Sequence, residues 1–257
     1  MEKDDGSREN GGSRSSKTLQ IVNNPRTVSD TKRAFYHNHA RPINSIYRRV
    51  VEELLVEIHL LRVNQTFVYD PVFALGVVTT FERFMQGYHP PADQTSIFNA
   101  ICLAQELDPQ QVQQDAQELL GRVRGQSLES LLDWISTAAS LGGDEQQNRL
   151  RAIASNPTFK YSRLFAVGLF TLLEQAEPEL GKDEARLLQV LQQVGEVMHL
   201  PVEKMQKDLE QYRSNLEKMT QARKTLEDIV AAERKRRQQN AAPDRSPESA
   251  SATEAPN

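Results

Sequence analysis

The sequence predicts an all-α protein: a helical globular bundle, then a long coiled-coil-like C-terminal helix, with disordered segments at both termini. Three observations lead to this prediction. Apolar residues recur every three or four positions through almost all of the chain between its two ends. Aspartate–proline pairs, which are typical of helix starts, occur twice. Glycine accounts for only 12 of 257 residues and aromatic side chains for 6%, which disfavours a β-sandwich or barrel with many tight turns.

Residues 1–24 are predicted to form a disordered leader. Met1 is the only apolar side chain among the first 17 residues, which otherwise carry mainly glycines, serines and charges. Such a composition cannot bury enough apolar surface to offset the conformational entropy that folding costs. The segment lacks the apolar core of a signal peptide, and its acidic residues are unlike a chloroplast transit peptide, so we expect neither.

A helical globular domain is predicted over residues 25–200. Its first long helix is expected from about Pro42 to Asn64, where apolar side chains step by three and four along one face. Pro42 suits the first turn, because the N–H that proline lacks would have no partner there. The strand-like residues 67–69 are too few for a sheet and are expected to form an extended link.

Two aspartates mark later helix starts. Asp70 and Asp108 each precede a proline, so a capping carboxylate stands before a proline at the first helical position. A pair of glycines after residue 141 is expected to end another helix. The helices predicted beyond residue 64 span about residues 70–86, 93–107, 108–123, 128–139, 159–175 and 183–198.

Residues 201–239 show a different pattern, which predicts one long coiled-coil-like helix. Apolar residues alternate three and four positions apart in a narrow seam, and no glycine or proline interrupts residues 202–239. At roughly 1.5 Å per residue such a helix is about 57 Å long, more than a small globule spans. Residues 240–257 hold three prolines among alanines, serines and acidic residues, and are predicted to form a disordered tail.

The apolar seam of this helix is a candidate contact surface. A helix of this length would be marginal with its seam in water, so we expect something to cover the seam. Arg223 argues against a simple homodimeric zipper, because a buried charge is costly unless it is paired. Partial docking on the globular domain and a partner with an acidic group opposite Arg223 both remain open. The candidate seam or partner contacts are Leu209, Tyr212, Leu216, Met219, Arg223, Leu226 and Val230.

The long helix ends in four consecutive cations that are candidate contacts for an anionic surface: Arg234, Lys235, Arg236 and Arg237. Near an anionic lipid surface each basic residue contributes about 1 kcal/mol, enough for weak docking but not for stable anchoring. A purely structural role is also open, because cations stabilise a helix C-terminus. The segment has no interleaved aromatic residues for base stacking and the chain has a net charge of −4, so nucleic acid is not expected as a partner.

No catalytic residue, cofactor-binding residue or metal ligand is predicted, and we expect a protein that is not an enzyme. The sequence contains no glycine-rich phosphate loop, no His-Glu-x-x-His and no Gly-x-Ser-x-Gly motif. His37 and His39 are expected to have surface or capping roles, because two residues apart in a helix-like segment they do not share a face. His59 is expected to be a satisfied or boundary histidine. Cys102, the single cysteine, is expected to be a buried, inert thiol.

A membrane-spanning helix is not expected either, since no run approaches the roughly 18 apolar residues that such a helix needs.

Four segments of the chain carry a family resemblance. They read RTVSDTKRAFY (26–36), RPINSIYRRVVEELLVEIHLL (41–61), FVYDPVFALGVVTTFERFMQGY (67–88) and IFNAIC (97–102). In these segments the sequence closely resembles the thylakoid formation protein family, also described as photosystem II biogenesis proteins. The resemblance extends over about residues 24–200 and more loosely over the long helix.

This resemblance implies an all-helical protein that is peripheral to the thylakoid membrane, on its cytoplasmic face, and the missing transit peptide favours a cyanobacterial member. It implies a role in photosynthetic membrane biogenesis and in photosystem II assembly and repair. The implied partners are photosystem II assembly or repair components and an FtsH-type membrane protease complex, which the protein would stabilise as an adaptor. No metal or cofactor comes with the family. The alternative function is a lipid-binding, membrane-shaping protein that acts directly on thylakoid lipids.

Overall fold

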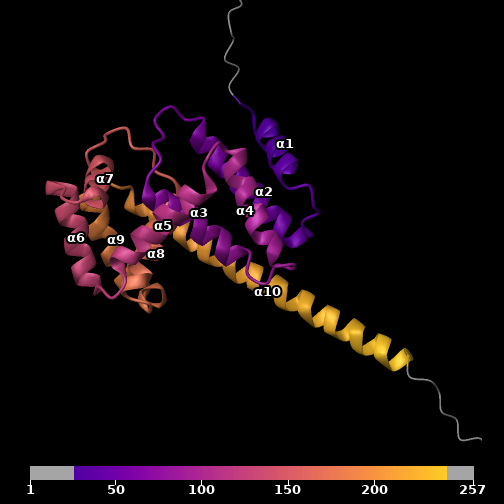
Figure 1. The fold of residues 1–257 in the computed structure, drawn as a ribbon. Helices are drawn as coiled ribbons and strands as arrows, with labels where there is room; N and C mark the ends of the chain where they lie inside the picture. Colours follow the sequence, from indigo (N-terminus) through magenta and orange to yellow (C-terminus); the bar gives the residue numbers. More distant parts are fainter. Residues whose placement is uncertain (1–25, 242–257) are drawn as a thin grey trace, which may run out of the picture.

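The structure, a computed structural model, describes residues 26–241, and over this range it contains only helices and the turns and loops that join them (Figure 1). The predicted all-α fold with a long C-terminal helix is confirmed. The predicted leader of residues 1–24, and residues 242–257 of the predicted tail, lie outside the described residues. The α-helices are α1 (Val28–Asn38), α2 (Ser45–Arg62), α3 (Pro71–Phe84), α4 (Ala92–Ala104), α5 (Pro109–Val123), α6 (Leu128–Leu141), α7 (Glu145–Ala154), α8 (Arg163–Ala176), α9 (Glu184–Met198) and α10 (Val202–Ala241), and a 3₁₀-helix, η1, lies at Leu180–Lys182.

Both predicted aspartate caps start helices. Asp70 Oδ1 accepts a hydrogen bond from the Phe73 backbone N–H at 2.8 Å, which satisfies one of the free donors at the start of α3. Asp108 Oδ1 accepts a hydrogen bond from the Gln110 N–H at 2.9 Å at the start of α5. Residues 67–69, which precede the first of these caps, lie in a loop and form no strand, as predicted.

Two short helices, α1 and α7, were not predicted from the periodicity. Each opens with a capping box, in which the cap side chain and the side chain three residues later bond to each other's backbone N–H groups. The helix predicted over residues 159–175 begins later than expected, at Arg163, because Ser162 provides its N-cap. The two capping boxes pair Thr27 with Asp30 and Asp144 with Gln147.

Helices α3 and α8 form the centre of the fold and cross with their backbones in contact. Gly76 of α3 and Gly168 of α8 make this approach possible, since a Cβ atom on Gly76 would lie 1.7 Å from the Leu164 carbonyl oxygen. A Cβ atom on Gly168 would lie 1.9 Å from the Val72 carbonyl oxygen. No side chain fits at either position, so the two glycines set how closely the central helices pack.

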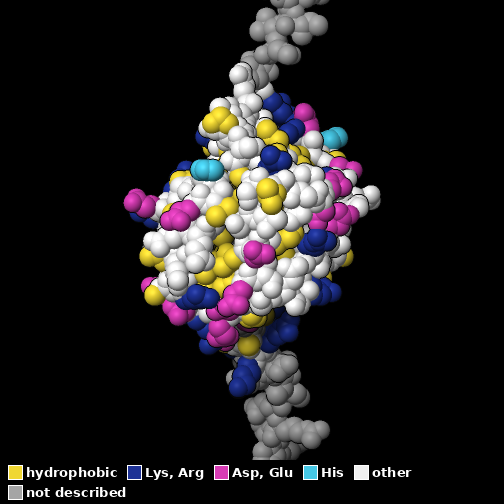
Figure 2. All heavy atoms as spheres, turned by 90° about the vertical axis from the view of Figure 1, so that its left-hand side faces the viewer, with side chains coloured by type: hydrophobic (Ala, Val, Ile, Leu, Met, Phe, Trp, Pro, Cys, Tyr) yellow, Lys and Arg dark blue, Asp and Glu magenta, His cyan; other side chains and the backbone are white. Residues whose placement is uncertain are grey.

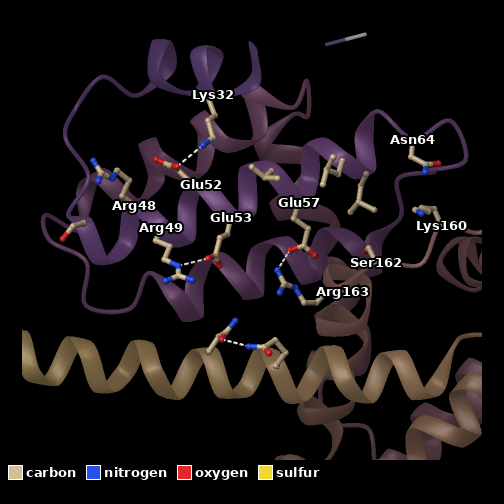
Figure 3. A pocket seen from close by; sticks show the side chains of 16 residues that line it. Lys32, Arg48, Arg49, Glu52, Glu53, Glu57, Asn64, Lys160, Ser162 and Arg163 are labelled. Atoms are coloured by element: carbon tan, nitrogen blue, oxygen red, sulfur yellow. Dashed lines mark hydrogen bonds and ion pairs between the residues drawn. The ribbon is translucent and has the colours of Figure 1, made fainter. Parts of the chain in front are cut away.

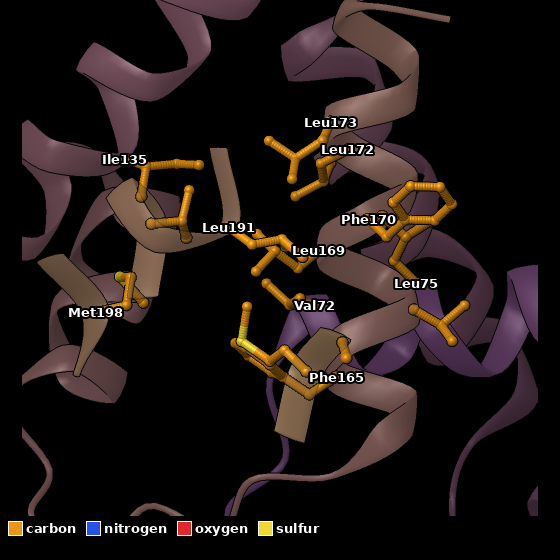
Figure 4. Close-up of a cluster of buried hydrophobic side chains, with 14 of the residues drawn as sticks. Val72, Leu75, Ile135, Phe165, Leu169, Phe170, Leu172, Leu173, Leu191 and Met198 are labelled. Atoms are coloured by element: carbon orange, nitrogen blue, oxygen red, sulfur yellow. The ribbon is translucent and has the colours of Figure 1, made fainter. Parts of the chain in front are cut away.

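Apolar side chains pack on both sides of this central pair. On one side α1, α2 and α4 cover α3 with a cluster that includes Phe35, Leu55 and Ile101. On the other side α6, α9 and the start of α10 pack against α8, with Leu169 and Leu191 between them (Figure 4). On the face that α6 and α7 present at the left of Figure 1, acidic and basic side chains are interspersed (Figure 2). This face therefore carries no field of a single sign.

Candidate functional site

The long helix α10 divides into two parts with different surroundings. Its anchored segment, residues 202–223, packs against α2, α3, α8 and α9, and its projecting segment, residues 224–241, extends beyond the globular domain (Figure 1). The globular domain itself therefore covers the first half of the predicted seam. Along the seam, Leu209 and Tyr212 are buried, Leu216, Met219, Arg223 and Leu226 are half-buried, and Val230 is 41% exposed.

Polar and aromatic contacts hold the anchored segment in place. The Tyr161 hydroxyl donates a hydrogen bond to Asp208 Oδ2 at 2.9 Å, and Lys204 Nζ lies 5.0 Å from the centre of the Tyr161 ring. Burial and the Asp208 carboxylate raise the pKa of Tyr161, so its hydroxyl stays protonated and remains a donor. The Tyr212 ring packs edge-on against Phe84 of α3, with ring centres 5.8 Å apart.

Arg223 is the last residue of the anchored segment, and its side chain bonds this segment to the globular domain. Its Nη1 donates a hydrogen bond to the Gln86 carbonyl oxygen at 3.0 Å, and the Tyr47 hydroxyl donates to the same oxygen at 3.0 Å. Gln86 follows directly on the last turn of α3, where a cation is favoured by the helix dipole. The Arg223 charge is thus partnered within the chain, and Glu227 Oε1 lies 3.9 Å from its Nε. The alternative of partial docking accounts for this arginine in the seam without an external acidic group.

A groove of about 980 Å³ lies between α2 and α10 and is also lined by residues of α1 and of the start of α8 (Figure 3). Its carboxylates are engaged by neighbouring cations, and the bond from Lys32 lowers the pKa of Glu52. Two of these ion pairs join α1 and α8 to α2 and the third lies within α2, so none presents a reactive group to solvent. The pairs are Lys32–Glu52 at 3.0 Å, Arg49–Glu53 at 2.9 Å, and Arg163–Glu57.

The projecting segment carries the four predicted cations. All of residues 234–237 are exposed, and so are two apolar side chains one to two turns before them, Ile229 at 52% and Val230 at 41%. The exposed surface of this segment thus combines apolar groups with a cationic cluster. This combination is suited to contact with an anionic surface, because apolar burial and charge attraction would act together.

The histidines lie in different surroundings. His37 is exposed. His39 is not at the surface, since its side chain is only 2% exposed, but it is the C-cap residue of α1, in agreement with the capping alternative. Its ring is tilted against that of Phe35, with ring centres 6.2 Å apart, and its Nδ1 pairs with Ser96 Oγ of α4 at 2.9 Å, which draws the ring into the α1–α4 contact. His59 is buried and satisfied as expected, with its Nδ1 2.9 Å from Thr31 Oγ1.

Cys102 is buried and carries a free thiol, as predicted. Burial raises its pKa to about 12, which keeps the sulfur protonated and poorly nucleophilic. Among residues 26–241 no group of three or more histidine, cysteine, aspartate or glutamate side chains is placed to hold a metal ion. No helix in the same range has both the length and the apolar character needed to cross a membrane.

Two contacts that position α10 escaped prediction from the sequence. The hydrogen bond between Tyr161 and Asp208 joins residues 47 positions apart, and that between Arg223 and Gln86 joins residues 137 positions apart. Neither pairing leaves a periodic signal, because each depends on how separate helices are arranged. The only hint in the sequence is the arginine within the apolar seam, which requires some partner.

Comparison with known proteins relates the whole described fold to one family. The family model for the thylakoid formation protein matches residues 27–241. Protein Thf1 of Acaryochloris marina is 57% identical over 217 residues, which cover 84% of this chain and 88% of that protein. Protein Thf1 of Nostoc punctiforme is 56% identical over 219 residues, which cover 85% of this chain and 93% of the relative.

A solved structure gives the same answer. The structure of Psb29 at 1.55 Å superposes with a TM-score of 0.74 at 50% sequence identity, covering 83% of this chain and 99% of that one. The family match spans both the globular domain and the long helix, so it does not rest on a single shared motif. The chain belongs to the thylakoid formation protein family.

Proposed function

We propose that this chain is a non-enzymatic peripheral protein of the cytoplasmic thylakoid face, and that it acts in photosystem II assembly and repair as an adaptor that stabilises an FtsH-type membrane protease complex. One observation carries the proposal: α10 is anchored at one end in the globular core and exposes apolar and cationic side chains at the other. A rigid body with a projecting helix is suited to joining two surfaces and needs no reactive group.

The physical basis of such stabilisation is mass action. A protein that binds the assembled protease complex more tightly than its separate subunits shifts the population toward the assembled form. The projecting segment supplies a surface for this selective binding, since its residues 224–237 are largely free of the globular domain. The globular domain would then hold the segment at a fixed angle, which lowers the entropy lost on association.

The test is a truncation chosen from the structure. Deleting residues 226–257 leaves the buried contacts of Leu209 and Tyr212 in place, and also the hydrogen bond from Arg223 to the Gln86 carbonyl oxygen. We expect the truncated protein to fold, and the amount of assembled protease complex in the membrane to fall. The matched control is Gln206→Ala, an exchange in the anchored segment, on a side chain that bonds only within its own helix.

Circular dichroism and thermal unfolding would establish that the truncated protein keeps its fold. If a folded truncation sustains the same amount of assembled complex as the full chain, the projecting segment has no part in the mechanism.

A direct lipid-binding function is the second candidate, and the exposed cations at residues 234–237 favour it. Flotation with vesicles that contain anionic phospholipid, at low and high salt and without any protein partner, separates the two functions. At about 1 kcal/mol per basic residue, replacing all four cations with glutamine is expected to lower partitioning at low salt by at least tenfold. Partitioning that is equal at both salt concentrations would exclude a charge-driven contact.

A further inference from the structure

A second, inner cavity continues inward from the groove beside α10. Its volume is about 470 Å³, within the range of small-molecule pockets, and its walls come from α2, α3, α8 and α10. The inner cavity and the outer groove share residues of α2, α8 and α10, so the inner cavity adjoins the groove of Figure 3. Neither the proposed adaptor role nor the packing of the core makes use of this space.

The lining of the inner cavity is mainly apolar at depth and charged at the rim. Leu54, Phe84 and Val167 are buried at its walls, and Met219 of α10 lies half-buried beside them. At the rim, the ion pairs Arg49–Glu53 and Arg163–Glu57 neutralise most of the charge. An occupant would therefore place hydrocarbon inside and would not need a net charge.

Two hydroxyl groups of the cavity lining are buried with no acceptor for their O–H protons. They are Thr80 Oγ1 on α3 and the hydroxyl of Tyr212 on α10, whose side chain is only 3% exposed. An unsatisfied buried polar group costs about 1–3 kcal/mol, so two of them in one cavity call for an explanation.

Arg83 does not supply the acceptor that the Tyr212 hydroxyl lacks. Its guanidinium pairs with Glu174 at 2.6 Å and also acts on the Tyr212 oxygen as a hydrogen-bond donor, which lowers the pKa of Tyr212, but because it can only donate it offers no acceptor to the Tyr212 O–H. Burial has the larger effect and raises the pKa of Tyr212 to about 12, so its O–H stays protonated and has no acceptor. The cavity lining thus leaves two O–H donors, those of Thr80 and Tyr212, without an acceptor.

We propose that the inner cavity binds a neutral apolar molecule that carries a carbonyl oxygen, with the hydrocarbon against Leu54, Phe84 and Val167 and the carbonyl accepting hydrogen bonds from Thr80 and Tyr212. A carbonyl has two lone pairs and can accept from both hydroxyls at once. A carboxylate is a poorer fit, because burying an unpaired charge is far more costly than burying a neutral oxygen. Acyl esters and alkyl-substituted quinones both supply this chemistry.

The experiment uses the full-length protein and three probes below their micelle concentrations. They are 1-monolauroylglycerol, its ether analogue 1-O-dodecylglycerol, which lacks the carbonyl, and decyl-benzoquinone. Calorimetric titration is expected to show saturable one-to-one binding of at least one carbonyl probe. We expect the ether analogue to bind at least fivefold more weakly than the ester if the ester is bound, and the comparison of ester with quinone identifies the source.

Two variants separate the cavity from the rest of the surface. Ala222→Trp, at a half-buried cavity position of α10, fills the space and is expected to abolish binding. Tyr212→Phe keeps the ring contact with Phe84 and removes only the hydroxyl, so it is expected to bring the affinity for the carbonyl probe close to that for the ether. The proposal is overturned if neither carbonyl probe binds the wild-type chain saturably, if Tyr212→Phe leaves carbonyl-probe binding unchanged, or if a folded Ala222→Trp still binds.

Discussion

Gly76 and Gly168 face each other where α3 crosses α8, and the missing side chain of each is replaced by a backbone carbonyl of the other helix. The carbonyl oxygen of Leu164 occupies the position where a Cβ on Gly76 would be, and that of Val72 does so for Gly168. This crossing positions everything that follows, because α2, α5 and α10 all pack on one or both of these helices.

We predict that Gly76→Ala destabilises the protein strongly. An added Cβ 1.7 Å from a backbone oxygen cannot be relieved by a side-chain rotation, so the helices must separate. The expected loss in the free energy of unfolding is about 3 kcal/mol, at the upper end of overpacking effects. Urea denaturation monitored by circular dichroism measures it.

The matched control for this exchange is Gly121→Ala in α5. Gly121 is exposed and helical, and no atom of another element lies within 4 Å of the place that a Cβ would take, so the added methyl group meets open space. Alanine there is expected to stabilise the helix by about 0.5–1 kcal/mol. Equal effects of the two substitutions would show that the crossing does not depend on backbone contact.

Arg223→Ala tests the hydrogen bond that holds the end of the anchored segment. Loss of its hydrogen bond to the Gln86 carbonyl is expected to leave global stability within about 1 kcal/mol of wild type, because the bond is at the periphery of the fold. Local opening should increase instead, so that the amides of residues 213–223 exchange with solvent several-fold faster. Hydrogen–deuterium exchange with mass spectrometry resolves the two effects.

The neighbouring exposed residue Lys224 provides the control for that experiment. Lys224→Ala removes a cation from the adjacent turn position without touching Gln86, and we expect no change in exchange over the anchored segment. If Arg223→Ala also leaves the exchange rates of these amides unchanged, hydrophobic contacts alone hold α10, and the arginine does not help to hold it.

The predictability of this fold from sequence follows the strength of each local signal. The apolar stripe of α2 and the caps at Asp70 and Asp108 were identified because periodicity and cap chemistry are strong there. The predicted start of α2 at Pro42 was wrong, because Asn44 caps the helix and its first residue is Ser45. Helices α1 and α7 were missed because they are only 11 and 10 residues long, and each buries just two residues, so few apolar positions mark them. Their capping boxes were the available signal.

The candidate site was harder to predict than the fold. A heptad-like seam indicates that α10 needs a covering surface but not which surface, since Tyr212 would serve equally well against a second chain. Its position against Phe84, and the space left between α2 and α10, depend on the angle at which separate helices cross. Such angles are set by the sum of all packing contacts, so no short segment encodes them.

Asp70 provides a prediction on pH and charge. Burial raises its pKa to about 7, against the opposing effect of the N–H groups of Phe73 and Val72. A folded pKa above the unfolded value of 3.8 means that the folded state holds its proton more tightly, so this group's contribution to stability is lost as pH rises from about 4 to 7. Asp70→Asn keeps a capping oxygen without the charge, and we expect it to be more stable than wild type at pH 8.

The dependence on pH checks the cause of this effect. The advantage of Asp70→Asn should shrink when thermal unfolding is measured at pH 5, where the wild-type carboxyl is mostly protonated. Asp70→Ala removes the cap altogether and is expected to cost about 1 kcal/mol relative to Asp70→Asn at either pH. If the wild-type protein is more stable than the asparagine variant at pH 8, the helix dipole stabilises the charged carboxylate by more than burial destabilises it.

We predict that protonation of the two buried histidines in mild acid makes α1 open more often. Burial is the main cause that lowers the pKa of His39 and of His59, so the folded state favours the neutral form of both rings. Around His39, Asp93 opposes the shift and Arg41 adds to it; around His59, Asp30 opposes and Arg26 adds. Because the folded pKa values lie below the unfolded value of 6.5, the unfolded state binds more protons and stability falls as pH drops from about 6.5.

Helix α1 should respond first, since one of these rings joins it to α2 through Thr31 and the other joins its C-terminal end to α4 through Ser96. We expect amide exchange in residues 28–38 to accelerate between pH 7.5 and pH 5.5, relative to the intrinsic rates, more than exchange in α3 or α8. In a variant with both histidines replaced by asparagine, whose amide can occupy the Nδ1 position but does not titrate, this difference should largely disappear. The same acid response in that variant would assign the effect to carboxylates such as Glu52, which pairs with Lys32 of α1, and not to the histidines.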